Sequence, residues 1–433
     1  MADKLSPKGL MRQRKFLPLF LTQFLGAFND NLFRNALVVL ITFKISVSSL
    51  PADPKILSSI AAALLVAPYI FFSSLAGELA DKYERSRLMR YTKFFEVVVM
   101  LAAAYGFYTN NIVLLMSLLF GAGMQATFFS PMKYSVLPTH LEKNELIRGN
   151  GLIESGTFLA ILSGNIVGNT LGGYVNIDAP ITSFLISGAL IFFALCGVAS
   201  SFFIPEARAA EPNLKVSANL FKSSFFIIRS VYRNKIVFRA ILFTSWFWLC
   251  GSVFLSLLPG YVKEFLHTDN TLYTICLTAF SIGIAIGAVT TGKIIGNKIT
   301  AKYTYLALFG VAFFTLCMIG FSSFASQRTE LQTASEFFGN WYALPIIAAM
   351  IITTFCWGVY SVPLKTIIQH HSNEAERSRI IAGENIFNAF FMVAANLICG
   401  LLIYIGFTIV QIFATIAIIN IFIGIMARKL WKD

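Results

Sequence analysis

Long apolar runs joined by short polar links constrain the fold of this chain more than any other feature. Each run is long enough to cross a bilayer as an α-helix, which needs about 20 residues. Strands of an outer-membrane barrel are about ten residues long and alternate in polarity, so the runs exclude that fold. Hydrophobic residues make up 57% of the chain and charged residues 13%, against about 25% in soluble domains. The sequence therefore predicts an all-α integral membrane protein.

We predict twelve transmembrane helices in two six-helix halves. Their expected ranges are 16–46, 56–80, 91–109, 112–136, 148–174, 180–204, 237–262, 272–296, 303–325, 342–369, 380–404 and 406–428.

The longest link divides the chain into an N-terminal half (1–204), a linker (205–236) and a C-terminal half (237–433). Residues 214–233 mix Phe and Ile with Lys and Arg. This pattern is typical of an amphipathic helix on the inner membrane surface, and a solvated tether is an equally good interpretation.

Basic residues predict the orientation. Nearly all of the 34 Lys and Arg residues lie at the two termini or in the links that alternate with the spans on one side. The other side carries Lys44, Lys55, Lys263 and Arg328. Because positively charged loops stay in the cytoplasm, we expect both termini there.

Several classes of function are not expected. There is no separate basic domain, so nucleic-acid binding is a poor interpretation. The six Cys residues lie in or beside apolar runs without a CxxC pair, and they predict neither disulfides nor a metal site. We expect a monomer without a cofactor.

A polar stretch interrupts the first span. Asp30 and Arg34 are four residues apart, so they share a helix face and can neutralise each other, with Gln23 and Asn31 on or near the same stripe. Charges at membrane depth cost at least a few kcal/mol each, which favours the wall of a transport pathway. The alternative is that these residues only hold helices together.

The segment between the second and third spans carries a second signal. Residues 77–87 read GELADKYERSR, which resembles the signature loop of the major facilitator superfamily. Gly77 would permit a close helix approach, while Asp81 can meet a helix N-terminus and a nearby Arg. We expect a conformational latch of Gly77, Asp81, Arg85 and Arg87, and Glu96 is interpreted as a structural partner of this segment.

A short internal repeat supports two related halves. Pro131-Met132-Lys133 ends the fourth predicted span, and Pro363-Leu364-Lys365 ends the tenth, six spans later. Each is followed by a Gly-containing restart, at 148–154 and 382–388. Parallel six-helix repeats are typical of major facilitator transporters.

The resemblance extends to a narrower family. The QFLGAFNDN stretch at 23–31, SPMKY at 130–134 and NGLIE at 150–154 resemble the bacterial lysophospholipid transporter (LplT) family and the membrane domain of 2-acylglycerophosphoethanolamine acyltransferase fusions. The resemblance implies a major facilitator fold and a flippase. It would move lysophosphatidylethanolamine and lysophosphatidylglycerol from the outer to the inner leaflet, for phospholipid remodelling by a separate cytoplasmic acyltransferase or acyl-ACP synthetase.

No His is followed by the H-x4-D spacing of those acyltransferases, so we expect a transporter and not an enzyme. Some relatives carry an Arg in the seventh span that can partner the first-span Asp. Here residues 251–256 are uncharged, and Arg34 is the nearest candidate substitute.

A lysophospholipid needs a polar zone for its head and an apolar zone for its tail. The candidate head-group residues place charges or amides within spans or at their ends: Gln23, Asn29, Asp30, Asn31, Arg34, Lys133 and Glu154. Arg34 suits a bidentate phosphate contact, and Asp30 would orient it or accept from an ethanolamine ammonium. Lys133 could equally be a snorkelling interface residue. Phe28 and Phe33 are the candidate tail-binding residues.

Two other functions stay open. One is a proton-coupled small-molecule permease or drug exporter, with Asp30 and Glu154 as the proton relay. The other is a membrane scaffold for a cytoplasmic acyltransferase, held through the 205–239 link.

Overall fold

The computed structural model describes residues 7–44, 54–174, 183–217, 219–296, 298–325 and 331–431. Some basic residues of the charge pattern fall outside this description, namely the whole of Lys4, Arg328 and Lys432 and the side chains of Lys8, Lys44 and Lys55. Within these ranges the regular elements are helices, apart from an isolated bridge between Thr268 and Gln332.

Twelve long helices account for the described chain, which confirms the predicted fold class. They are α2 (Leu17–Val39, continued by η1, Leu40–Lys44), α3 (Pro54–Lys82), α4 (Arg85–Tyr108), α5 (Ile112–His140), α6 (Lys143–Tyr174), α7 (Ser183–Ser201), α9 (Lys235–Gly260, continued by η4, Tyr261–Phe265), α10 (Asn270–Ile294), α11 (Thr304–Ala325), α13 (Ala343–His371), α14 (Arg377–Tyr404) and α15 (Ile409–Leu430). The short helices are α1 (Pro7–Leu10), α8 (Leu220–Arg233), α12 (Ala334–Phe338) and η5 (Glu374–Glu376).

Ten of the described helices are long and apolar enough to span a membrane by length and composition. The other two long helices are α2 and α4, and both carry charges within the predicted span. Asp30 and Arg34 lie in α2, while Lys93 and Glu96 lie in α4. These two helices therefore hold the polar residues that need an explanation.

Several helices extend past the predicted spans at their charged ends. The fourth was expected to end at residue 136, but α5 continues to His140 with Pro131 and Pro138 inside it. Between α3 and α4 only Tyr83 and Glu84 are not helical, so the expected loop is a two-residue turn. The apolar run shows only which residues lie in the membrane core. Backbone hydrogen bonds continue past its end, so each helix is longer than its apolar run.

The packing divides the chain into two units that interleave along the sequence. Unit 1 comprises Met1–Gly149, Leu159–Phe238 and Gln369–Ala389, and unit 2 comprises Asn150–Phe158, Arg239–Ile368 and Phe390–Asp433. Helices α6, α9, α13 and α14 therefore contribute residues to both units. The division at residues 204 and 236 stays a prediction.

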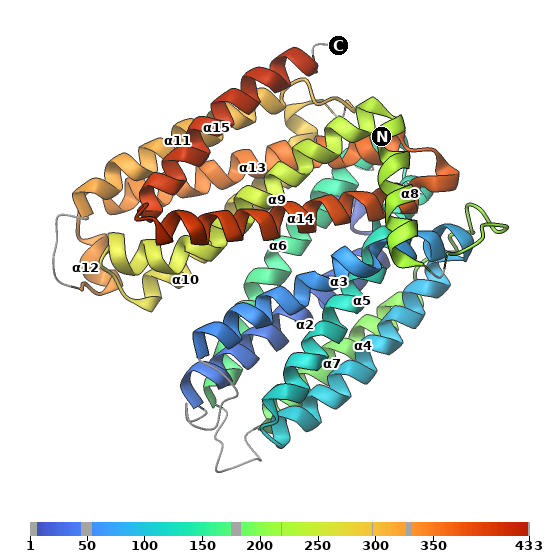
Figure 1. The fold of residues 1–433 in the computed structure, drawn as a ribbon, viewed down its shortest axis with the longest axis horizontal. Helices are drawn as coiled ribbons and strands as arrows, with labels where there is room; N and C mark the ends of the chain where they lie inside the picture. Colours follow the sequence, from blue (N-terminus) through green and yellow to red (C-terminus); the bar gives the residue numbers. More distant parts are fainter. Residues whose placement is uncertain are drawn as a thin grey trace. The chain divides into compact units, whose positions relative to one another are not determined.

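In unit 1, α3 packs along α5, and α4 packs along both α5 and α7 (Figure 1). Helix α2 lies against α7, and its inward face forms the hydrophobic core with Leu32, Phe33 and Leu37, none of which is exposed. In unit 2, α11 packs along α15. The ring of Phe254 stacks on Phe280 and Phe413 there, at 5.2 and 5.1 Å between centroids.

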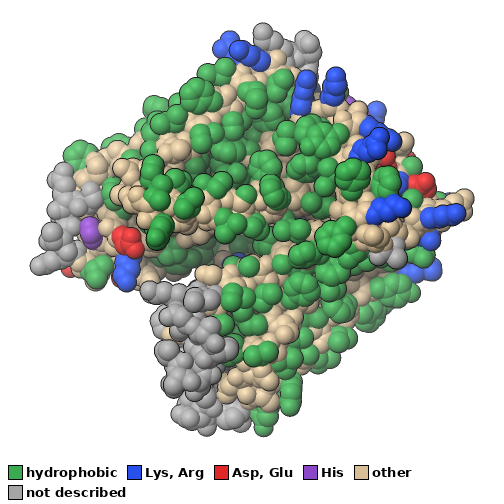
Figure 2. Space-filling model, viewed as in Figure 1, with side chains coloured by type: hydrophobic (Ala, Val, Ile, Leu, Met, Phe, Trp, Pro, Cys, Tyr) green, Lys and Arg blue, Asp and Glu red, His purple; other side chains and the backbone are tan. Residues whose placement is uncertain are grey.

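Hydrophobic side chains cover the visible sides of the helices in each unit (Figure 2). Large exposed residues occur on α4, α7, α11, α14 and α15 alike. Apolar surface of this extent is rare on soluble proteins and is expected where lipid tails replace water. The chain is therefore a multi-pass membrane protein.

The link contains helix α8. Its Ser223, Ile227 and Val231 are buried, and a Cβ on Gly383 of α14 would lie 2.9 Å from Val231. The opposite side exposes Phe221 and large aromatic neighbours. This exposed aromatic face is compatible with α8 lying on the inner membrane surface, which stays a prediction.

A stripe of glycines lets α6 approach α2 closely. Gly164, Gly168 and Gly172 recur every four residues, so they share one face of α6. A Cβ on Gly168 would lie 2.6 Å from the Leu32 carbonyl oxygen, and one on Gly164 would meet the Phe28 carbonyl oxygen. Small residues allow this backbone contact, which is a common way to join helices in membranes.

We predict that Gly168→Leu destabilises unit 1 by about 1–3 kcal/mol or more, because the new side chain would overlap the α2 backbone. The measurement is the thermal unfolding midpoint of the purified protein in detergent. Gly173→Leu is the matched control, since a Cβ at Gly173 on the same helix meets nothing within 4 Å. Equal midpoints for the two variants would contradict the packing argument.

Candidate functional site

A buried ion pair lies at the centre of unit 1. The Nζ of Lys93 is 2.5 Å from Oε2 of Glu96, and both side chains are 1% exposed. The Nδ2 of Asn29 donates to the other Glu96 oxygen at 3.3 Å and to the Leu190 carbonyl oxygen of α7 at 3.1 Å. Helices α2, α4 and α7 thus meet through polar contacts.

Asp30 belongs to the same group. It is 7% exposed, and its carboxylate interacts electrostatically with Glu96 and Lys93. We call Asn29, Asp30, Lys93 and Glu96 the buried charge cluster. The expectation that Glu96 serves the 77–87 segment was wrong, because Glu96 binds Lys93 and Asn29 instead.

Small residues make room for the Lys93 side chain. A Cβ on Gly26 would collide with its ammonium, and a Cβ on Gly197 of α7 would lie 3.7 Å from it. The ammonium also lies 5.2 Å from the centroid of the Phe129 ring. A ring face and a carboxylate are both favourable surroundings for a buried cation.

Arg34 faces a different helix. Its Nη2 donates to Oδ1 of Asn165 on α6 at 3.4 Å, and Asn35 donates to the same oxygen. Asn31, the amide one turn earlier, donates to the Ala27 carbonyl oxygen at 2.8 Å. We call Arg34, Asn35 and Asn165 the Arg34 site. The charges that act on the Asp30 carboxylate include those of Glu96 and Lys93 on α4.

The candidate tail-binding residues lie in the core of unit 1. The ring of Phe28 is 4.4 Å from that of Phe193, and the ring of Phe33 is 5.9 Å from that of Phe107. Gln23 is also buried, at 3% exposed. In this structure the two phenylalanines contribute to packing between α2 and its neighbours α4 and α7.

Glu154 and Lys133 belong to different units. Glu154 is buried in the segment Asn150–Phe158, which packs within unit 2, where Asn150 donates to the Thr366 hydroxyl at 3.0 Å. Lys133 lies in unit 1, half-buried, with its ammonium 4.6 Å from the centroid of the Tyr134 ring.

A pocket in unit 2 has a volume of about 30 Å³. Its lining is mostly apolar and includes Phe254, Phe280 and Trp357. One water molecule needs about 10–15 Å³ of such space, so the pocket has room for about two.

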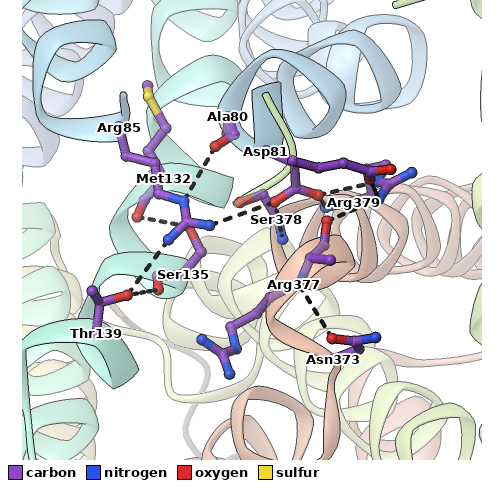
Figure 3. A network of polar contacts seen from close by, with 12 residues as sticks. Ala80, Asp81, Arg85, Met132, Ser135, Thr139, Asn373, Arg377, Ser378 and Arg379 are labelled. Atoms are coloured by element: carbon purple, nitrogen blue, oxygen red, sulfur yellow. Dashed lines mark hydrogen bonds and ion pairs between the residues drawn. The ribbon is translucent and has the colours of Figure 1, made fainter. Parts of the chain in front are cut away.

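Asp81 forms the second polar cluster of unit 1, between α3 and the start of α14 (Figure 3). Its two carboxylate oxygens accept from the backbone N–H groups of Ser378 at 3.0 Å and Arg379 at 3.1 Å. The Nε of Arg379 donates to the same carboxylate at 3.1 Å. A carboxylate at a helix N-terminus satisfies orphan donors and complements the helix dipole.

Arg85 lies on the other side of this carboxylate. Its Nη2 is 3.8 Å from Asp81 Oδ1, and its Nε donates to the Ala80 carbonyl oxygen at 3.2 Å (Figure 3). Burial lowers the pKa of the Arg85 guanidinium, and the Asp81 and Glu374 carboxylates oppose that shift. An Arg side chain keeps its charge in any case, so Asp81 has a permanent cation beside it.

Two further features stabilise the contact between α3 and the start of α14. A Cβ on Gly77 would lie 2.6 Å from the Ala382 Cβ and 2.9 Å from the Arg379 Cα, so α3 and α14 touch at this glycine. The link also docks here, because Glu211 donates its N–H to the Asp81 carbonyl oxygen at 2.8 Å and accepts from Arg379 at 2.5 Å.

Arg87 does not join the Asp81 cluster. It is 66% exposed and pairs with Glu84 at 3.3 Å on the surface of α4. Ser86, which departs from the superfamily pattern, accepts from the Ala207 N–H at 3.1 Å and so helps to dock the link.

Sequence reasoning missed four partners in these sites: Lys93, Asn165, Ser378 and Arg379. Lys93 could have been found, since it stands three residues before Glu96 inside a predicted span. Arg379 directly precedes the eleventh predicted span, but no local pattern connects it with Asp81, which lies 298 residues earlier.

Removal of the Asp81 carboxylate should be strongly destabilising. We expect Asp81→Ala to lower the free energy of unfolding by roughly 3–5 kcal/mol, because Arg85 and the start of α14 lose their acceptor. Thermal unfolding in detergent measures the change. Arg87→Ala is the control and should cost no more than about 1 kcal/mol, as an exposed ion pair does. A similar loss of unfolding free energy in both variants would contradict the argument that the buried Asp81 contacts stabilise the fold more than the exposed Arg87 pair.

Comparison with known proteins identifies the family. The family model of the Major Facilitator Superfamily matches residues 19–395. Lysophospholipid transporter LplT of Cronobacter sakazakii is 26% identical over 382 residues, which cover 87% of this chain and 85% of that protein. Lysophospholipid transporter LplT of Citrobacter koseri is 26% identical over 393 residues, which cover 90% and 89%.

Solved structures share the fold at low identity. The human organic anion transporter MFSD10 (TETRAN) superposes with a TM-score of 0.69 at 12% identity, covering 95% of this chain and 99% of that chain. A bacterial homologue of the iron transporter ferroportin, in an outward-facing state, gives a TM-score of 0.69 at 13% identity, covering 97% and 99%.

Proposed function

Because the chain belongs to the Major Facilitator Superfamily, we propose that it carries lysophospholipids, chiefly lysophosphatidylethanolamine and lysophosphatidylglycerol, between the leaflets of a bacterial inner membrane. That the chain is a membrane transporter follows from its family and fold. The proposed substrate rests on the similarity to LplT proteins over nearly the whole length of both chains.

The Arg34 site supports a phosphate-bearing substrate. Arg34 is half-buried on α2, next to the apolar core residues Leu32, Phe33 and Leu37. A guanidinium at that depth in a membrane is costly, which favours a functional role for it. A phosphate can accept two parallel hydrogen bonds from it. Asn35 and Asn165 would hold the guanidinium in place, since both amides meet beside it.

The remaining candidates take secondary roles in this proposal. Lys133 would receive the phosphate at the end of α5, and Glu154 would attract an ethanolamine ammonium. Asn31 and Gln23 would supply further amides on the same helix as Arg34. We keep no tail-binding role for Phe28 and Phe33, because each ring packs against another ring of the core.

The Asp81 cluster supports transport by alternating access. Asp81 binds two neighbouring N–H groups at the start of α14, so both hydrogen bonds would form or break together. A conformational latch requires a contact of this kind. The proposal is that this contact favours one state of the transporter and opens in the other. Movement from the outer to the inner leaflet, with both termini cytoplasmic, would deliver substrate to a separate cytoplasmic acyltransferase or acyl-ACP synthetase.

The test of this function is flipping in proteoliposomes of the purified protein. Labelled lysophosphatidylethanolamine is compared with its diacyl counterpart, with and without an ion gradient. Fast movement of the lysolipid alone supports the proposal. No lysolipid movement, together with gradient-driven movement of unrelated solutes, would favour a small-molecule permease. No flux of any kind would favour a membrane scaffold.

We predict that Arg34→Ala abolishes lysolipid flipping, because it removes the proposed phosphate ligand. The initial rate in proteoliposomes should fall at least tenfold, which corresponds to about 1.4 kcal/mol of lost interaction. Arg208→Ala is the matched control, because Arg208 is 87% exposed and pairs only locally with Glu206 among the described residues. A well-folded Arg34→Ala variant that transports normally would rule out the head-group role.

A further inference from the structure

Helix α8 packs on unit 1 with one face and leaves the opposite face uncovered. It lies beside the ends of α3 and α14 (Figure 1). Its buried residues Ser223, Ile227 and Val231 recur every four positions and therefore share one face. On the outer face an aromatic stripe runs next to a basic stripe. We propose that this outer face binds the headgroups of anionic phospholipids, and that α8 thereby holds α3 against the start of α14.

The aromatic stripe consists of Phe221, Phe225 and Tyr232. These residues are spaced by four and seven positions, so they share a face of the helix. Their side chains are 80%, 63% and 54% exposed. Large exposed rings are unfavourable in water, and α8 has only 14 residues, whereas a transmembrane helix needs about 20. The stripe is therefore expected at the membrane interface, where aromatic rings pack at the level of the headgroups.

The basic stripe consists of Lys222, Arg229 and Arg233. Their spacing of seven and four positions places them on a face next to the aromatic stripe, and all three side chains are exposed. The Lys222 ammonium lies 6.0 Å from the centroid of the Phe226 ring. None of the three forms an ion pair with a residue that the structure describes. Three such cations on one face complement the negative potential of an anionic membrane surface.

Acidic side chains near α8 bind its inner side. The Glu78 carboxylate of α3 accepts from the Ser223 hydroxyl, and it also accepts from the Ser217 N–H at 2.8 Å. The Glu376 carboxylate accepts from the Ser230 hydroxyl at 3.0 Å. These carboxylates anchor α8 to the protein through serines, so an anion for the basic stripe has to come from outside the described chain.

A phospholipid is the occupant that fits both stripes at once. Its phosphate can bind the guanidinium groups of the basic stripe, while its acyl chains cover the neighbouring rings. A free phosphate ion or an acidic protein segment would use the cations but would leave the rings in water. Anionic lipids are favoured over zwitterionic ones because the stripe carries a net positive charge.

The inner contacts of α8 connect this lipid site with the Asp81 cluster. Glu78 precedes Asp81 by three residues on α3, and Glu376 directly precedes α14, whose first N–H groups bind Asp81. A Cβ on Gly383 would lie 2.9 Å from Val231, so α8 also packs on α14 itself. A lipid that holds α8 in place should therefore stabilise the contact between α3 and α14. This coupling rests on the proposed latch, whereas lipid binding by α8 does not.

The primary experiment measures thermal unfolding of the purified full-length protein in detergent, with added diacyl phosphatidylglycerol or diacyl phosphatidylcholine of the same chain length. A ligand bound only by the folded state raises the midpoint, so phosphatidylglycerol should raise it more. Each basic residue near an anionic surface changes the affinity about fivefold. Arg229→Gln should therefore raise the phosphatidylglycerol concentration for half-maximal stabilisation about fivefold, and glutamine at all three basic positions roughly a hundredfold. A wild type that responds equally to both lipids overturns the proposal.

A matched triple variant separates a site on α8 from the effect of net charge. Lys293→Gln, Lys298→Gln and Lys302→Gln together remove three exposed charges from the link between α10 and α11. This variant should keep the wild-type preference for phosphatidylglycerol. An equal loss of preference in both triple variants would overturn the assignment to α8. Inorganic phosphate and a polyglutamate peptide are the further probes, and stabilisation by either one as strong as that by phosphatidylglycerol would overturn the assignment to lipid.

Amide hydrogen exchange tests the coupling. Phosphatidylglycerol should slow the exchange of the Ser378 and Arg379 N–H groups several-fold, because both are bonded to Asp81. Ser223→Ala combined with Ser230→Ala should keep the lipid preference and lose this slowing. Lipid binding with unchanged exchange in the wild type would refute the coupling.

Flipping in proteoliposomes then separates this inference from the proposed function. A preference for phosphatidylglycerol that depends on the basic stripe, in a protein that flips no lysolipid, would support the lipid site and refute the proposed substrate. Lysolipid flipping by a protein without that preference would support the substrate and refute the lipid site.

Discussion

A charge inside a bilayer has to find its partner within the protein, and the arrangement of unit 1 follows from this constraint. Lys93 and Glu96 sit on α4, but their partner Asn29 and neighbour Asp30 sit on α2, and Asn29 continues to the backbone of α7. The three helices therefore have one register in which these groups meet. Apolar packing alone would allow several registers of the three helices, because hydrophobic contacts are not directional.

The two polar clusters solve the problem of buried charge differently. The buried charge cluster relies on side chains, and the Oδ1 atoms of Asn29 and Asp30 have no donor among the residues that the structure describes. Asp81 has donors from two backbone N–H groups and an Arg side chain, which suits a contact that is either made or broken. Glycines accompany both clusters, because Gly26 gives space to an ammonium and Gly77 gives space to a helix.

The sequence was sufficient for the number of long helices and for the importance of α2 and the 77–87 segment. It could not identify neighbours. Periodicity shows which residues share a face of a helix, but not which helix that face meets. Glu96 was therefore paired with the wrong segment, and the contact of Arg34 with Asn165 on α6 was not foreseen. The same limit applies to Phe28, since an aromatic ring in a span fits a core as well as a lipid tail.

The hydropathy of the sequence also could not predict where the helices begin and end. The apolar run of the third span starts at about residue 91, yet α4 begins at Arg85, where the backbone N–H of Arg85 binds the Ala207 carbonyl oxygen of the link. Contacts of this kind join residues more than a hundred positions apart. They become visible only when the chain is folded.

The separation between Asp81 and its partner has a consequence for biosynthesis. The N–H group of Arg379 lies 298 residues after Asp81 along the chain. At about 5–20 residues per second, a ribosome needs roughly 15–60 s to make that length. During this interval Arg85, four residues away, is the cation that accompanies Asp81. Arg85 is thus synthesised together with Asp81, whereas the backbone donors Ser378 and Arg379 follow only after this interval.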